Sequence, residues 1–128
     1  MGTFKTLSRT GWHVATVLAI ALAALPARSQ NRYTSMGNDS NGNPVLLDNE
    51  SISGTRYSLV IQVEGNPAIL SLTASCKTNQ LIVNRLTIFD RQGNQIFDNQ
   101  SPEELRFPPN SPTARSLAEI CRRSRREQ

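Results

Sequence analysis

The sequence predicts an α+β domain in which an antiparallel sheet of about five to six strands carries one C-terminal helix on one face. Two patterns predict this fold: short runs of alternating apolar residues, and one helical apolar stripe near the C-terminus. The strands are joined by short turns with no crossover helix between them, which favours antiparallel pairing. A cysteine in one strand and a cysteine on the helix provide a candidate tether between the two elements.

Residues 1–29 have the pattern of a secretory signal peptide. Basic residues precede twelve uncharged, mostly apolar residues at 14–25, a run too short to span a bilayer. We expect cleavage after Ser29, with cleavage after Ala27 as the alternative. No cysteine lies near either position, so we expect neither a lipid anchor nor a transmembrane segment.

The remaining chain is expected to form a polar arm, one domain and a basic tail. Residues 30–44 are rich in Asn, Ser and Gly, and such a segment cannot bury enough apolar surface to offset its ordering entropy. We therefore expect a flexible arm at 30–44, a single domain at 45–124 and a basic tail at 122–128.

Alternating hydrophobicity defines the expected strands. In one of them, residues 69–76, the alternation places Cys76 on the apolar face with Leu70, Leu72 and Ala74. The run 81–89 is apolar on both sides and is expected to be a central strand, followed by a hairpin loop at 90–94. The expected strand segments are 45–47, 56–63, 69–76, 81–89 and 95–98, and residues 99–111, which hold three prolines, are expected to be a connecting loop.

A helix is expected to begin at Ser111-Pro112, because Ser favours the N-cap position and Pro the first helical position. Its apolar stripe consists of Ala114, Leu117, Ala118 and Cys121, with Ile120 beside them.

The two mature cysteines are expected to form one disulfide, Cys76–Cys121, because an even count in a small exported domain favours pairing. The bond would hold the helix across one face of the sheet. Two free buried thiols are the alternative. A redox or nucleophilic role is not expected, because there is no C-x-x-C spacing and no mature histidine to generate a thiolate.

Charge gives little information about the domain surface. The formal net charge is +4, but residues 30–121 hold seven basic and nine acidic residues, so the excess lies at the two ends. The basic tail provides candidate partner contacts for a phosphate, a lipid headgroup or an acidic protein, or it only complements the helix dipole. No aromatic residue interleaves the arginines, so we expect no nucleic-acid partner. These candidate contacts are Arg122, Arg123, Arg125 and Arg126.

We expect no enzyme, cofactor or metal site. The only histidine precedes residue 30, which excludes Ser-His-Asp triads, Cys-His pairs and His-ligated metals from the mature chain. The carboxylates fall in expected turns or strand ends, where they are solvated. Asp39, Asn41, Asn43 and Glu50 match the ligand spacing of a calcium loop, but Pro44 stands where that loop needs Gly. We therefore interpret them as part of the polar arm.

The sheet face opposite the helix is expected to be a contact surface. Val60 and Ile69 alternate with residues that face the helix, so they point to the other side. One helix cannot cover both faces, and we expect self-association or docking through Val60 and Ile69.

Five short motifs follow one another along the chain: Leu47-Asp48-x-x-Ser51-Ile52, Cys76 after an alternating strand, Asp90-x-x-Gly93, Pro109-x-Ser111 and Cys121. Together they resemble the bacterial surface-adhesin protein E family over about residues 45–121. The resemblance implies an antiparallel sheet with a C-terminal helix that a disulfide holds to its concave face. It also implies binding of host extracellular-matrix and plasma proteins at the bacterial surface, as members of this family do. The family's adhesin is anchored as a lipoprotein, whereas this chain has no cysteine to lipidate.

The expected function is that of a secreted or periplasmic, non-enzymatic, adhesin-like module that binds another, unidentified protein. The alternative is an accessory subunit that stabilises a cell-envelope or periplasmic complex. A small hydrolase or a metal-binding protein is a third and weaker class.

Overall fold

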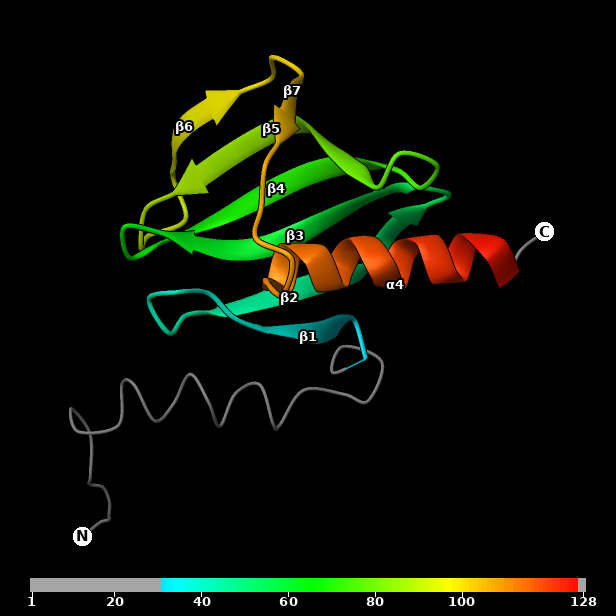
Figure 1. The fold of residues 1–128 in the computed structure, drawn as a ribbon. Helices are drawn as coiled ribbons and strands as arrows, with labels where there is room; N and C mark the ends of the chain where they lie inside the picture. Colours follow the sequence, from blue (N-terminus) through cyan, green and yellow to red (C-terminus); the bar gives the residue numbers. More distant parts are fainter. Residues whose placement is uncertain (1–30, 127–128) are drawn as a thin grey trace, which may run out of the picture. The chain divides into compact units, whose positions relative to one another are not determined.

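The structure is a computed structural model that describes residues 31–126. The expected signal peptide and its cleavage site lie outside the described residues. Residues 33–126 form one antiparallel sheet with helix α4 lying across one face (Figure 1). The strand order is β1-β2-β3-β4-β5-β6. Strand β7 pairs with the first part of β5, on the same edge as β6, which pairs with the last part. The predicted fold class is confirmed. The elements are β1 (Tyr33–Asn38), β2 (Pro44–Ser53), β3 (Arg56–Val63), β4 (Asn66–Ser75), β5 (Gln80–Phe89), β6 (Gln95–Asn99), β7 (Glu103–Leu105) and α4 (Pro112–Arg126).

Two of these strands were not expected from the sequence. The predicted flexible arm at 30–44 is wrong, because residues 33–38 form β1, an edge strand of the sheet. Met36 anchors the strand in the core, where only 7% of it is exposed, and backbone pairing with β2 adds to this. The expected connecting loop at 99–111 likewise contains the short strand β7. The sheet therefore has seven strands.

A β-bulge in β5 explains how a run that is apolar on both sides fits a sheet with one covered face. Arg85 pairs with Ser71 and Val83 pairs with Leu72, so Asn84 is the extra residue between them. Its amide donates to Thr73 Oγ1 at 2.7 Å. The bulge reverses the alternation, so that the apolar residues before and after it share the helix side of the sheet. These residues are Leu81, Val83, Leu86 and Ile88.

Helix α4 begins as predicted, but the face that it buries is rotated from the predicted stripe. Ser111 Oγ accepts the Ala114 amide at 3.1 Å and caps the helix. Ser116, Leu117, Ile120 and Cys121 are buried, whereas Ala118 is exposed. Because Ala118 follows Leu117 by about 100° around the helix axis, a face centred on Leu117 and Ile120 turns Ala118 to solvent.

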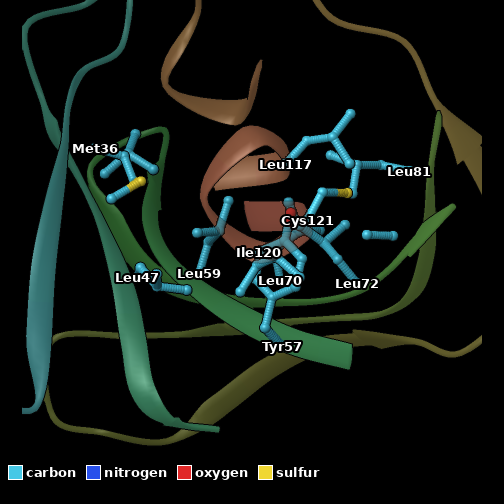
Figure 2. Packing of buried hydrophobic residues seen from close by; sticks show 12 residues of the cluster. Met36, Leu47, Tyr57, Leu59, Leu70, Leu72, Leu81, Leu117, Ile120 and Cys121 are labelled. Carbon is cyan, nitrogen blue, oxygen red and sulfur yellow. The ribbon is translucent and has the colours of Figure 1, made fainter. Parts of the chain in front are cut away.

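The core lies between α4 and the sheet, as Figure 2 shows. Leu59, Leu81 and Ile120 are fully enclosed, with 0% of each residue exposed. Apolar residues of strands β1 to β5 and of the helix meet here, which makes this interface the main source of hydrophobic stabilisation. The core residues are Met36, Val45, Leu47, Tyr57, Leu59, Leu70, Leu72, Ala74, Leu81, Leu117, Ile120 and Cys121.

The predicted disulfide is confirmed, and the alternative of two free thiols is wrong. Cys76 and Cys121 are bonded with their Cα atoms 5.6 Å apart. Cys76 directly follows β4 and is exposed, whereas Cys121 is buried on the helix. The bond therefore attaches the last turns of α4 to the end of a central strand.

A buried hydrogen bond also joins α4 to the side of the sheet that the helix covers. Tyr57 Oη lies 2.9 Å from Ser116 Oγ. Ser116 Oγ donates to the Thr113 carbonyl oxygen at 2.7 Å, so the Tyr57 hydroxyl acts as the donor to Ser116. Burial of the phenol raises the pKa of Tyr57 to about 12, because it disfavours the phenolate.

Within residues 31–126, no helix has the length and apolar character needed to cross a membrane.

Removal of the disulfide should destabilise the domain. We expect Cys121→Ser to lower the free energy of unfolding by roughly 2 to 5 kcal/mol, as is usual for a small exported domain that loses its bridge. Urea unfolding of the wild type and the variant measures this, and thiol titration of the denatured, unreduced wild type should find no free thiol. Two reactive thiols would contradict the assignment.

The raised pKa of Tyr57 predicts a loss of stability at alkaline pH. Between pH 10 and 12 the unfolded chain releases the phenol proton while the folded chain retains it, so stability is complete below pH 10 and falls as the pH rises. The expected loss is roughly 2 to 3 kcal/mol near pH 12. Urea unfolding across this range should show a smaller decrease for Tyr57→Phe. Equal decreases in the two proteins would show that Tyr57 has no such effect.

Candidate interaction edge

Large apolar side chains are exposed at few places in the described part of the chain. The exposed fractions are 40% for Ile69, 54% for Ile96 and 46% for Phe97. Ile69 lies on the face of the sheet opposite α4, whereas Ile96 and Phe97 are neighbours in the edge strand β6. The structure therefore separates the exposed apolar surface into two places.

The face opposite the helix is less apolar than the sequence suggests. Val60 and Ile69 are paired across β3 and β4 and lie side by side, as expected from alternation. Val60, however, is half-buried. Around the pair lie polar groups that satisfy one another, including Ser58 Oγ and Ser71 Oγ at 3.4 Å. With Leu46, which pairs with Val60 and is also half-buried, the predicted contact surface is a row of three apolar residues bordered by polar groups.

An ion pair occupies the same face where it reaches β6. Arg85 donates to both carboxylate oxygens of Asp98, at 2.8 and 3.1 Å. The hydrogen bonds from Arg85, Gln100 and Thr87 lower the pKa of Asp98, with Arg85 as the largest cause. Asp98 is the only charged residue of β6, and its charge is balanced by Arg85. The strand thus presents no unpaired charge of its own.

The two outer edges of the sheet differ in how well they are protected against further strand pairing. At β1, the register is broken between Ser35 and Asn38, and Arg115 Nη1 donates to the Met36 carbonyl oxygen at 2.8 Å. A bulge and an occupied carbonyl are both devices that prevent pairing with another strand. The edge at β1 is therefore blocked.

The other edge is formed by β6 and β7, which pair with successive parts of β5. Strand β7 carries two exposed acidic residues, Glu103 and Glu104, and follows Pro102, which are typical protective features. Strand β6 also has a register shift against β5, with Ile96 as its extra residue. It has neither a proline nor an unpaired charge, however, and it exposes Ile96 and Phe97. We refer to Gln95–Asn99 as the β6 edge. It is the least protected strand edge among residues 33–126.

The turn before the β6 edge is well ordered by its own hydrogen bonds. Asp90 Oδ1 accepts the amides of Gln92 and Asn94 at 2.9 and 2.8 Å. These bonds, with that of Asn94 the largest, lower the pKa of Asp90. Gly93 adopts a φ of 89°, a value that favours glycine. The turn that leads into the β6 edge is therefore closed by hydrogen bonds to the Asp90 side chain.

The arginines of the predicted basic tail have two different environments. Arg122 and Arg123 both pair with Glu119, the latter at 2.6 Å, and Arg123 also donates to Asn49 Oδ1 at 3.2 Å. The paired arginines lower the pKa of Glu119, with Arg122 as the largest cause. Arg125 and Arg126 are exposed in the last turn of α4. Only these two remain as exposed cations of the candidate set.

The residues that resembled a calcium loop serve a structural role. Asp39 Oδ1 accepts the amides of Asn41 and Asn43, both at 2.9 Å, in the turn between β1 and β2. Glu50 lies well inside β2. No cluster of three His, Cys, Asp or Glu residues occurs within residues 31–126. The calcium-like spacing of Asp39, Asn41 and Asn43 therefore reflects the hydrogen bonds of a turn.

A depression of about 550 Å³ lies between this turn and the start of α4. Its walls include Val45 and three prolines, Pro108, Pro109 and Pro112, and its only titratable residue is Asp39. Because Asp39 Oδ1 is already held by backbone amides, the depression contains no acid-base pair. The expectation that the chain is not an enzyme stays a prediction.

Sequence reasoning placed Ile96 and Phe97 in a short strand but did not identify them as contact residues. A signal was present, because two adjacent large apolar residues follow a tight turn and no later strand is predicted to pair with them.

No protein-family model, curated protein or solved structure matches the chain. The resemblance to the surface-adhesin protein E family therefore stays a prediction.

Exposure of the β6 side chains predicts that they contribute little to folding. We expect Ile96→Ser and Phe97→Ser each to change the free energy of unfolding by less than about 1 kcal/mol. Leu59→Ala, in the core, should cost roughly 2 to 5 kcal/mol. Urea unfolding of the three variants tests this difference. A loss at Phe97 as large as that at Leu59 would show that the side chain is needed for the fold.

Proposed function

We propose that this chain is an exported, non-enzymatic protein-binding module of the adhesin type, located in the periplasm or outside the cell, and that it contacts its partner through the β6 edge. The observation that carries the proposal is the exposure of Ile96 and Phe97 on an unprotected strand. Exposed apolar residues on an open edge are a liability in a protein that works alone. A protein that docks through this edge buries them.

Export is supported by the disulfide. Cys76 and Cys121 are bonded, and such bonds persist in oxidising compartments and are rare in the cytosol. The signal-like pattern of residues 1–29 supports the same interpretation. The disulfide and the signal-like pattern therefore support the same compartment.

Binding at the β6 edge is favoured over binding at Val60 and Ile69. The pair at Val60 and Ile69 offers one well-exposed side chain within a hydrogen-bonded polar face. The β6 edge offers two large side chains together with main-chain groups on its outer side, which no strand among residues 31–126 covers. Main-chain and apolar contacts together are the usual basis of strand addition to a sheet edge.

Photo-crosslinking in cells tests the proposal. A photoreactive amino acid is placed at Phe97 in the full chain, and the matched control places it at Ile69, which is exposed to a similar extent. We expect a protein adduct from Phe97 in the exported fraction and little or none from Ile69. Adducts only from Ile69 would move the contact to the opposite face, and no adduct from either position would contradict a protein-binding function.

A further inference from the structure

We propose that the partner at the β6 edge is the β6 edge of a second copy of this chain. The two strands would pair antiparallel about a two-fold axis at Phe97 and join two sheets into one. The proposal rests on the proposed function, since both use the same edge, but it adds the identity of the partner and the register of the contact.

The main chain of β6 suits a strand as its partner. β6 is bonded to β5 on one side, and the amides and carbonyls that point away from β5 lie along its outer side. An antiparallel pair of identical strands satisfies these groups in both copies at once, because a two-fold axis gives each strand the same partners. The blocked edge at β1 offers no equivalent surface.

The side chains fit this register. Phe97 is paired with Ile88, so it points to the helix side of the sheet, and the axis places it next to Phe97 of the second copy. The aromatic rings would then cover one another. Ile96 would lie opposite Asp98 of the second copy, and Asp98 is already neutralised by Arg85. Pairing therefore buries the exposed apolar groups without leaving a charge unpaired.

The charges at the two ends of the edge are complementary in the same register. Along β5, Phe97 is level with Ile88 and Glu103 is level with Val83. Because Asn84 is the extra residue of the bulge, these two positions are four residues apart along β4, or about 13 Å at the rise of a strand. On the other side of the axis, Arg91 lies in the turn three residues past Ile88, at no more than about 10 Å along the strand. An arginine side chain can span the difference between these two distances from the axis, so Arg91 of each copy would reach Glu103 of the other.

Arg91 and Glu103 are available for this contact. Both are exposed, and neither forms an ion pair with another residue of the 31–126 range. The two-fold axis makes the contact twice in each dimer. Because the strand pair is short, the interface is small and belongs to the class of weak, concentration-dependent contacts.

Charge reversal with sedimentation of the mature chain tests the register. We expect the wild type to show a monomer-dimer equilibrium, and Arg91→Glu and Glu103→Arg each to weaken dimerisation by about tenfold, since two exposed pairs are lost. The double variant, Arg91→Glu with Glu103→Arg, should recover affinity to within about threefold of the wild type, because the pairs re-form with reversed sign. An equal mixture of the two single variants should also dimerise like the wild type.

Matched controls separate this contact from a general effect of net charge. Arg56→Glu and Glu64→Arg make the same charge changes at exposed positions outside the β6 edge, and we expect wild-type dimerisation from both. A monomeric wild type at every soluble concentration, or a double variant no better than the single variants, overturns the proposal.

The crosslinking experiment distinguishes the two proposals from each other. An adduct from Phe97 that contains only this chain supports both. An adduct with a different protein, together with a monomeric wild type, keeps the protein-binding function and overturns the dimer. Absence of any adduct, with a monomeric wild type, overturns both.

Discussion

The contact between α4 and the sheet is the interaction on which the rest of this domain depends, because it gives the apolar side of the strands a partner to pack against. Leu117 and Ile120 are almost wholly enclosed there. The helix is held near its start by Arg115, which bonds to β1, and in its C-terminal half by the disulfide after β4. Its position is therefore set across the first four strands. β6 lies two strands beyond the disulfide-linked strand in the sheet order, and its large apolar side chains, Ile96 and Phe97, stay exposed.

The opposite face of the sheet carries no second layer within residues 33–126. Its polar side chains suit a face that is exposed to water. Hydrogen bonds between side chains cross it from strand to strand, as at Asn84 with Thr73 and at Arg85 with Asp98. These groups remain hydrated or satisfy one another, so the face needs no apolar cover. The exposed apolar surface is consequently concentrated at the β6 edge, which is why we assign binding to an edge instead of a face.

The sequence was sufficient for the fold class, the helix start and the disulfide, because alternation, capping and cysteine count are local signals. It was not sufficient for β1, since low apolar content favoured a flexible arm. The pattern Asp39-Ser-Asn-Gly-Asn43 nevertheless matches Asp90-Arg-Gln-Gly-Asn94 at three positions. Both segments form the same turn, with the aspartate accepting two backbone amides. The adjacent residues Ile96 and Phe97 after a tight turn were a signal for the β6 edge, but their exposure depends on whether another strand pairs with β6, which a local pattern does not state.

The order of the strands in the sheet has a consequence for the speed of folding. Six strands follow one another in space as they do in sequence, so hairpins can form between near neighbours with little loop-closure entropy. The helix contacts are of the opposite kind: Tyr57 and Ser116 are 59 residues apart, and Met36 and Arg115 are 79 apart. In an oxidised chain the bond at Cys76 and Cys121 already closes most of these loops before folding begins. Docking of α4 is then a short-range search, and a reduced chain must carry out the same step as a slow, long-range one.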